Sequence, residues 1–539
     1  MNPTGTLLTP ERRARDSAAW RNTTIAREAW KKAAEHPDAV AFYMENEPDV
    51  SFGQIALAAR RLITALQSLG LRAGEVVSFQ LPNWPEAAAI DIAAAALGLV
   101  VNPIVPIYRD RELRFILGDA RSRLIFIPDR FRSIDYAAML LALQPELPEL
   151  AHIVTVRAAG AIAGTLRYEE ITAAAPADTA TLPAVDPNAL KCRLYTSGTT
   201  GFPKAVLHSH NTLRRINDNS IEHANIGPDD VMVMPSPVTH ITGYGSGINM
   251  PFASTAQTAF MERWDADAAI DLIKRVGGSL TVGATPFLQE LLDAAERRGE
   301  TLPTMRQFSC GGAAVPPQLV RRAYRVMPGC RTMRVYGSTE APIITLGWRE
   351  DPELAATTDG HPWYYEVRIL DNEGKAVPPG TDGEVAARGP GMFLGYADPQ
   401  QNAEAHTADG FFLTGDIGHL TPEGAIQITD RKKDIIIRGG ENLSAKDIED
   451  VLHSHPDIRE AAVVAMPHER LGESVCAYLI LRDGAAAPTV ESIAAFCNAA
   501  GMARQKFPER VVLVTEFPRT PSGKIRKDQL RLRLREPAA

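Results

Sequence analysis

The stretch Tyr195–Lys204 reads YTSGTTGFPK and carries four aliphatic hydroxyls, two glycines and a lysine within ten residues. Glycine can adopt positive φ, which lets backbone N–H groups surround an anion, while the hydroxyls donate hydrogen bonds and Lys204 adds a charge. A flexible surface loop is the commonest meaning of such a composition, but it explains neither the preceding apolar strand nor the lysine. A Walker loop is excluded because it ends in Gly-Lys-Ser/Thr, whereas Lys204 lies between Pro203 and Ala205. The stretch therefore predicts a loop that binds phosphate.

The composition is that of a globular protein with more than one domain. The chain has 539 residues, too many for a single core, and its 45% hydrophobic and 23% charged residues are ordinary for a soluble protein. The net charge of −8 argues against a general nucleic-acid binder. The cysteines show neither metal-ligand spacing nor a disulfide framework, which predicts reduced thiols in a cytoplasmic protein. They are Cys192, Cys310, Cys330, Cys476 and Cys497.

No segment of the sequence predicts a secretory signal or a membrane span. Met1–Trp30 mixes charged residues and proline and lacks an apolar signal region. Ile92–Tyr108 is free of charge, but it is rich in alanine and contains two prolines, which favours a buried helix that leads into a strand.

The order of helical and apolar segments predicts the fold class. Ser51–Gly70 has helical periodicity, and apolar runs at 76–81, 100–101 and 124–127 alternate with helical segments, which indicates a mostly parallel, doubly wound α/β sheet. From Pro352 to Thr429, short β runs alternate with Gly and Pro turns, and we expect a small β-barrel-like subdomain there. The remaining residues, of about the length of one domain, read as a small α+β unit.

Two segments carry side chains suited to a nucleotide. Val335–Glu340 supplies an aromatic ring that can stack on a purine, a hydroxyl at Thr339 and a carboxylate at Glu340 that can bind Mg²⁺. Asp416 follows Thr414-Gly415, where a carboxylate can accept hydrogen bonds from ribose hydroxyls; an Asx turn is the alternative. The turn Cys310–Ala314 is glycine-rich but carries little information by itself.

A charge-free segment follows the phosphate loop in the sequence. No charged residue occurs between Asp230 and Glu262, and His240 lies within this span. By itself the segment is best explained by a buried loop and helix with a hydrogen-bonded core histidine. Beside a phosphate loop, it would also form a good wall for an apolar acyl group.

Two charged segments complete the pattern. Asp430–Asn442 changes abruptly from charged residues to an apolar strand and a Gly-Gly pair, which fits a domain boundary better than a solvated loop. Pro518–Lys527 reads PRTPSGKIRK, for which a basic tail is the alternative interpretation.

Taken in order, these segments resemble the signatures of the adenylate-forming superfamily, which contains acyl-CoA synthetases, peptide-synthetase adenylation domains and firefly luciferases. The resemblance extends from about Asp38 to Gln529, with Ala205 where a glycine is common and Arg438 where many relatives have serine. The chain is most similar to bacterial acyl-CoA ligases for medium-chain, alicyclic or aromatic acids. The resemblance implies an N-terminal AMP-binding domain over 1–432 with the ATP and acyl sites, and a small mobile C-terminal domain over 433–539.

The resemblance also implies roles for individual residues. The catalytic residues would be Lys524, Glu340 and Thr196, of which Thr196 and Glu340 would bind Mg²⁺. The ATP and AMP contacts would be Thr196, Ser197, Gly198, Thr199, Thr200, Gly201, Lys204, Gly312, Ala313, Ala314, Tyr336, Gly337, Ser338, Thr339, Asp416, Ile428, Arg431 and Lys524. The acyl pocket would be lined by His240, Ile241, Tyr244, Gly245, Gly312 and Tyr336. The hinge and the CoA side would comprise Lys433 as the pivot, with Arg438, Gly439, Gly440 and Glu441.

The implied activity is that of an ATP-dependent carboxylate–CoA ligase, a nucleotide-binding enzyme of fatty acid metabolism. It would use ATP, Mg²⁺, a carboxylic acid and coenzyme A, and would alternate between two domain orientations. A stand-alone adenylation enzyme that loads a carrier-protein thiol uses the same residues and remains the alternative. A catalytically inactive binding protein is disfavoured, because every residue that the chemistry needs is present. The sequence is compatible with a monomer or a homodimer.

Overall fold

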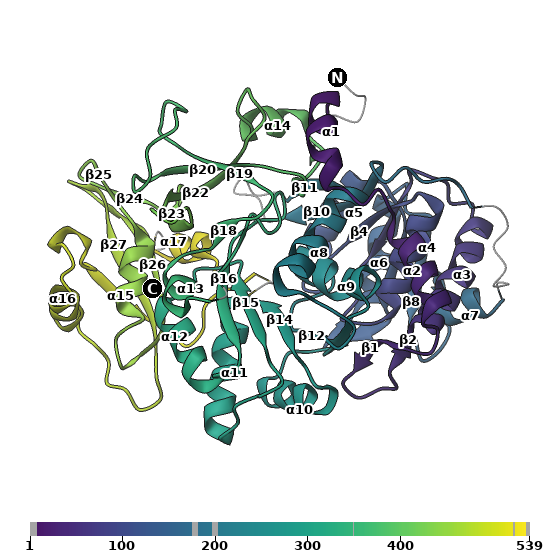
Figure 1. The fold of residues 1–539 in the computed structure, drawn as a ribbon, viewed down its shortest axis with the longest axis horizontal. Coiled ribbons are helices and arrows are strands. Elements are labelled where there is room, and N and C mark those ends of the chain that lie inside the picture. Colours follow the sequence, from purple (N-terminus) through teal and green to yellow (C-terminus); the bar gives the residue numbers. More distant parts are fainter. Residues whose placement is uncertain (1–7, 175–181, 197–202, 349, 521–522, 535–539) are drawn as a thin grey trace.

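Two mostly parallel β-sheets form the centre of the larger part of the molecule (Figure 1). The computed structural model describes residues 8–174, 182–196, 203–348, 350–520 and 523–534. Within these residues, the first sheet has the order β16 (Arg331–Val335), β15 (Gln307–Gly311), β14 (Leu280–Gly283), β12 (Val231–Met234), β13 (Gln257–Phe260), β1 (Val40–Met44) and β2 (Val50–Ser51). All of its neighbours are parallel except β1 and β2.

The second sheet carries the strands on both sides of the predicted phosphate loop. Its order is β21 (Gly395–Tyr396), β11 (Lys204–Ser209), β10 (Leu190–Thr196), β4 (Val100–Pro103), β3 (Val76–Phe79), β5 (Ser122–Pro128), β8 (His152–Val156) and β9 (Leu166–Arg167). The pairs of β11 with β10 and with β21 are antiparallel, and the others are parallel. The predicted parallel α/β architecture is therefore confirmed.

Helices cover both faces of these sheets, while the last three helices of the described chain pack against the C-terminal sheet. In chain order they are α1 (Pro10–Asp16), α2 (Ile25–Glu35), α3 (Phe52–Ser68), α4 (Glu86–Leu97), α5 (Asp110–Ala120), α6 (Tyr136–Leu143), α7 (Tyr168–Ala174), α8 (His210–Ala224), α9 (Met250–Ser254), α10 (Ala266–Val276), α11 (Thr285–Arg298), α12 (Pro317–Val326), α13 (Pro352–Thr357), α14 (Pro399–Ala405), α15 (Ala445–Leu452), α16 (Val490–Ala499) and α17 (Lys527–Arg533). Short 3₁₀ turns are η1 (Ser17–Ala19), η2 (Gln144–Glu146) and η4 (Arg504–Lys506), and η3 (Gly243–Asn249) is a π-helix. In the described parts of the chain, every helix is too short or too polar to cross a bilayer.

The core between the two sheets depends on small and apolar side chains. One apolar cluster joins β1 and β13 to β3 and β5 through α2, α3 and α4, while α10–α12 and α5–α6 cover the outer faces. Every residue from Ala87 to Leu97 in α4 is buried, because alanines let this helix lie close to its neighbours on all sides. The helix predicted from Ser51 begins with a capping box between Ser51 and Gln54, and its apolar face is buried as expected.

Two further sheets follow in the chain. The segment predicted as barrel-like forms a four-stranded antiparallel sheet with the order β19 (Glu366–Leu370), β20 (Gly383–Arg388), β22 (Phe412–Leu420) and β23 (Ile426–Arg431). The last sheet contains β25 (Glu441–Leu443), β24 (Ile436–Arg438), β27 (Gly472–Leu481), β26 (Ile458–His468) and β28 (Arg510–Leu513). Short antiparallel pairs are β6 (Arg130–Phe131) with β7 (Ile134–Asp135) and β17 (Thr345–Leu346) with β18 (His361–Pro362). Figure 1 shows the last sheet at the opposite end of the molecule from α2–α4.

Candidate active site

The predicted phosphate loop connects two paired strands. β10 ends at Thr196 and β11 begins at Lys204, and these two residues lie directly opposite each other in the antiparallel ladder. The hairpin therefore places a hydroxyl and an ammonium group at the two ends of the loop. The other predicted loop residues lie outside the described residues, and their phosphate contacts stay predictions: Ser197, Gly198, Thr199, Thr200 and Gly201.

Three side chains predicted to bind the nucleotide form one connected cluster. The hydroxyl of Tyr336 donates to Oδ2 of Asp416 over 2.8 Å, and Nε of Arg431 lies 3.0 Å from Oδ1 of the same carboxylate. Asp416 and Arg431 are also partners in the β22–β23 ladder. Burial, followed by the charge of Asp416, raises the pKa of Tyr336, so its hydroxyl remains a donor. An aromatic ring, a carboxylate and a guanidinium thus lie together, as purine stacking and ribose binding require.

A buried ion pair that the sequence did not reveal supports this cluster. Arg334 donates through Nε and Nη2 to the two oxygens of Asp359, at 3.0 and 2.8 Å. Asp359 also accepts the backbone N–H of Ile428 over 2.8 Å. Since Arg334 lies in β16 just before Tyr336, this bidentate pair fixes the strand that positions the aromatic ring.

The turn after Tyr336 is held by close backbone contacts. A Cβ on Gly337 would lie 2.5 Å from a backbone nitrogen further along the turn, so only glycine fits there. Oγ of Ser338 accepts the backbone N–H three residues later over 3.2 Å. Nε2 of His208 donates to the carbonyl of Thr339 over 2.7 Å. Burial lowers the pKa of His208 to about 4, so this support is a neutral imidazole.

The predicted catalytic lysine reaches this cluster from the C-terminal part of the chain. A Cβ on Gly312 would lie 3.6 Å from Cε of Lys524. Burial is the main cause that lowers the pKa of Lys524 to about 8; the charge of Arg431 acts in the same direction, and the carboxylates Asp416 and Glu340 oppose it. Lys524 therefore lies beside the glycine turn, and its charge interacts with Asp416 and Glu340, the carboxylates predicted to bind ribose and the metal ion.

The glycine-rich turn lies at the end of β15. Gly312 has a φ of +78°, which favours glycine, and the hydroxyl of Thr285 donates to the carbonyl of Ala314 over 2.8 Å. Ala313 lies between these two positions. The turn therefore presents backbone rather than large side chains to Lys524, as a site for a bound ring or acyl group requires.

Glu340 is the carboxylate that the sequence predicts for a metal ion. Its Oε1 accepts the hydroxyl of Tyr396 over 2.8 Å, a contact that the sequence did not reveal. Among the described residues, no group of three or more His, Cys, Asp or Glu side chains could hold a metal by itself. Mg²⁺ commonly takes one or two protein carboxylates and completes its shell with water and substrate phosphates, so Glu340 and Thr196 fit an ion that binds with ATP. Such an ion would neutralise charge on the triphosphate.

Comparisons with known proteins identify the family of this chain. The AMP-binding enzyme family model matches residues 29–397, and the model of the AMP-binding enzyme C-terminal domain matches residues 447–524. The chain belongs to the AMP-binding enzyme family. A medium-chain fatty-acid–CoA ligase of Escherichia coli (strain K12) is 34% identical, over 98% of this chain and 97% of the relative. A 2,3-dihydroxybenzoate-AMP ligase of Bacillus subtilis (strain 168) is 30% identical, over 96% of this chain and 95% of the relative.

A solved structure shows the same fold. ATP-bound MatB from Rhodopseudomonas palustris aligns with a TM-score of 0.84 and 25% identity, over 95% of this chain and 99% of that chain. The chain is therefore an adenylate-forming ligase by family. Since one relative is named a CoA ligase and another an AMP ligase, the acceptor of the acyl group needs its own argument.

The predicted acyl wall begins at His240. Burial lowers the pKa of His240 to about 3, with a further contribution from the charge of Lys524, so the imidazole is neutral in this AMP-binding enzyme. The carbonyl of His240 accepts the backbone N–H of Tyr244 over 2.7 Å at the start of η3. Ile241 is buried, and a Cβ on Gly245 would lie 3.4 Å from Ile216 of α8. The predicted wall residues from His240 to Gly245 are thus adjacent and largely apolar.

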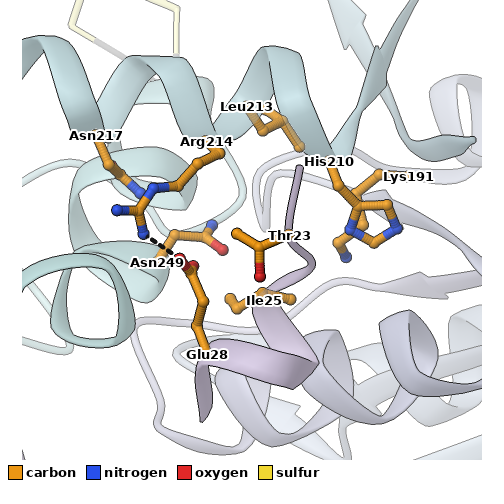
Figure 2. Close-up of a pocket in the computed structure, with 9 residues that line it drawn as sticks. All are labelled: Thr23, Ile25, Glu28, Lys191, His210, Leu213, Arg214, Asn217 and Asn249. Carbon is orange, nitrogen blue, oxygen red and sulfur yellow. Dashed lines mark hydrogen bonds and ion pairs between the residues drawn. The ribbon is translucent and has the colours of Figure 1, made fainter. Parts of the chain in front are cut away.

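Charged groups lie behind this wall, although the segment itself carries none. The hydroxyl of Tyr244 donates to Asp91 of α4, and Asp91 is also paired with Lys191 of β10; all three side chains are buried. Lys191 borders a small cavity in which Arg214 pairs with Glu28 (Figure 2). This cavity, of about 20 Å³, is too small for an acyl group and would fit about one water molecule.

The predicted hinge and CoA-side residues lie in the C-terminal part of the AMP-binding enzyme. Lys433 lies between β23 and β24, and burial followed by the charge of Arg431 lowers its pKa. The other four predicted residues belong to the β24–β25 hairpin. The two glycines at its turn have positive φ, and Arg438 pairs with Glu509 at 2.9 Å. They are Arg438, Gly439, Gly440 and Glu441. In the orientation described, Lys524 rather than this hairpin is the group next to Gly312.

Proposed function

We propose that this AMP-binding enzyme is an ATP-dependent carboxylate–CoA ligase, which forms an acyl-adenylate and then an acyl-CoA and releases pyrophosphate and AMP. The observation that carries the proposal is the position of Lys524, whose side chain lies beside Gly312 and whose pKa responds to Asp416 and Glu340. A cation at this position can bridge the oxygens of a carboxylate and of an α-phosphate. The proposed cofactors and substrates are Mg²⁺, ATP, a carboxylic acid and CoA.

In the first half-reaction, a carboxylate oxygen attacks the α-phosphorus of ATP, and the bond to the bridging oxygen of pyrophosphate breaks. Lys204, with the loop hydroxyls, would hold the departing β- and γ-phosphates, and Lys524 would stabilise the charge that develops around the α-phosphate. Asp416 and Arg431, already joined in the structure, would bind the ribose. The neutral imidazole of His240 would contribute to the carboxylate side of the pocket.

In the second half-reaction, a thiol sulfur attacks the acyl carbon, and the bond to AMP breaks. We propose that residues 433–539 rotate about Lys433 relative to residues 1–432, which would remove Lys524 and bring Gly439 and Gly440 to the site. The position of Lys433 between two sheets supports this, because hinges are short segments at the ends of elements that absorb backbone change.

A surface cavity favours CoA over a carrier protein as the thiol donor. It measures about 480 Å³ and lies at the carboxyl ends of β3, β5 and β13, the edge where ligands of parallel sheets bind. Four arginines, three carboxylates and two aromatic rings line it: Glu47, Trp84, Asp129, Arg130, Phe131, Arg132, Arg157, Glu262 and Arg263. Among the described residues, Arg132 and Arg263 form no ion pair, whereas Arg130 and Arg157 are paired with carboxylates. Guanidinium groups without such a partner, together with aromatic rings, suit the additional phosphates and the adenine of CoA, because a carrier-protein arm has one phosphate and no adenine.

The acid is proposed to be an apolar monocarboxylate. The wall from His240 to Gly245 is apolar, and the cations behind it, Lys191 and Arg214, are already paired with carboxylates. A second carboxylate on the substrate would therefore find no partner there. We expect monocarboxylates to exceed dicarboxylates of similar length in kcat/KM, and the reverse order would contradict this.

The test is to measure AMP formation with a panel of linear, alicyclic and aromatic acids, with CoA, pantetheine or a carrier protein as acceptor. The proposal predicts an acyl-CoA product and a much higher KM for pantetheine than for CoA. Arg132→Ala should raise the KM for CoA without changing that for pantetheine. Efficient thioester formation only on the carrier protein would favour the alternative function.

A further inference from the structure

Tyr396 contacts two predicted active-site residues that come from different parts of the chain. Its hydroxyl donates to Oε1 of Glu340 over 2.8 Å. The ammonium of Lys204 lies 5.0 Å from the centre of the Tyr396 ring, within the range of a cation–π interaction. One buried side chain therefore touches both the candidate metal carboxylate and the lysine at the end of the phosphate loop.

The backbone around Tyr396 is fixed on both sides. The buried amide of Asn402 accepts the N–H of Tyr396 over 2.7 Å and donates to its carbonyl over 2.9 Å. Within the same segment, the N–H of Phe393 donates to the carbonyl of Glu340 over 2.7 Å. The N–H of Ala397 donates to the carbonyl of Ala205 over 3.0 Å. The segment 393–397 thus connects the chain at Glu340 with β11, which begins at the phosphate loop.

The hydroxyl of Tyr396 is the donor in its bond with Glu340, because an ionised carboxylate can only accept hydrogen bonds. A neutral hydroxyl that donates to an ionised carboxylate forms a charge-assisted hydrogen bond, which is stronger than a bond between neutral groups. Such a bond restricts the rotation of the carboxylate of Glu340, which is otherwise only partly buried.

We propose that Tyr396 is a positioning residue for adenylation: its hydroxyl orients the carboxylate of Glu340 for the metal ion that binds with ATP, while its ring supports Lys204. The proposal rests on the adenylating function proposed above. It assigns to Tyr396 no contact with the reacting atoms. Its effect is therefore expected on metal-dependent binding of ATP and on the first half-reaction.

Tyr396→Phe tests the hydroxyl alone, because the ring beneath Lys204 is retained. A matched control is Tyr365→Phe. Tyr365 belongs to the same apolar cluster and is also buried, but its hydroxyl donates to the carbonyl of Pro342 over 3.4 Å. Loss of a hydrogen bond to a charged group should lower metal-dependent binding roughly 10-fold or more, whereas the control should behave as the wild type.

The first measurement is calorimetric binding of α,β-methylene-ATP with and without Mg²⁺, which needs neither turnover nor the correct acid. Adding Mg²⁺ raises the affinity of the wild type for this nucleotide, and we expect the rise to be roughly 10-fold smaller in Tyr396→Phe. The affinity measured without Mg²⁺ should be the same in both proteins. Pyrophosphate release should then require more Mg²⁺, while thioester formation from a synthetic acyl-adenylate should match the wild type. If the wild type binds the ATP analogue more tightly with Mg²⁺ but adenylates no acid, the proposed function is contradicted and the positioning role of Tyr396 is not.

The second measurement combines Tyr396→Phe with Glu340→Gln. If the tyrosine acts through Glu340, the double variant should lose no more Mg²⁺-dependent affinity than Glu340→Gln alone. The proposal is overturned if Tyr396→Phe has the Mg²⁺ dependence of the wild type and of Tyr365→Phe, if it slows both half-reactions equally, or if the two losses are additive.

Discussion

The pKa of Lys524 predicts an alkaline limit on the first half-reaction. Burial lowers this pKa to about 8, and the proposed role needs the charged form, so adenylation should be fastest below pH 8 and should fall as the pH rises through that value. About nine-tenths of the lysine is charged at pH 7, and about one-tenth at pH 9. We therefore expect kcat/KM for ATP–pyrophosphate exchange to fall roughly 10-fold between pH 7 and pH 9, because kcat/KM reports ionisation of the free enzyme.

Two variants show whether Lys524 causes the limit. Lys524→Arg keeps a charge that does not titrate in this range, so its exchange rate should be lower but level from pH 7 to 9. Lys524→Ala should nearly abolish exchange and should still form thioester from a synthetic acyl-adenylate and CoA. An unchanged 10-fold decline in Lys524→Arg would refute the assignment of the pH limit. Equal loss of both half-reactions in Lys524→Ala would refute the proposed alternation of domains.

Three other substitutions test separate parts of the structure. Glu340→Ala should lower the rate of pyrophosphate release roughly 10²–10³-fold, and an unchanged rate and Mg²⁺ dependence would remove Glu340 from the site. Lys433→Pro, which fixes φ near roughly −65°, should slow thioester formation more than adenylation in separate half-reaction assays; equal effects would contradict a pivot. Arg12 of α1 donates to the carbonyls of Met392 and Phe393, and Arg12→Met should lower the free energy of unfolding in urea by about 1–3 kcal/mol. An unchanged unfolding midpoint would show that these contacts contribute little.

Local patterns in the sequence were sufficient to predict the fold class, and they marked the separate segments of the candidate site. The alternation of apolar and helical segments predicted the parallel sheets, and the alanine-rich stretch from Ile92 predicted a buried helix, which forms the second half of α4. The phosphate loop was predicted from its glycines, hydroxyls and lysine, and the ladder places Thr196 opposite Lys204. In each case the informative residues are neighbours in the chain, which is the range over which such patterns act.

Contacts between distant segments could not be predicted in the same way. The bond between Tyr396 and Glu340 and the ion pair between Arg334 and Asp359 depend on how separate sheets meet, and neither partner carries a local signal. The charge-free span after Asp230 predicted a buried segment, which the structure shows, while its role as an acyl wall stays a prediction. The span could not show the Asp91–Lys191 pair, which other elements bring behind Tyr244. The roles assigned to the loop residues 197–201 remain predictions.

The most direct test of the central claim follows the oxygen atoms of the acid. The enzyme is given a carboxylic acid labelled with ¹⁸O in both carboxylate positions, together with ATP, Mg²⁺ and CoA, and the products are analysed by mass spectrometry. If the carboxylate attacks the α-phosphorus and AMP later leaves the acyl carbon, one labelled oxygen must appear in AMP and the other must remain in the thioester carbonyl. Unlabelled AMP, or label found only in released phosphate or pyrophosphate, would contradict an acyl-adenylate intermediate.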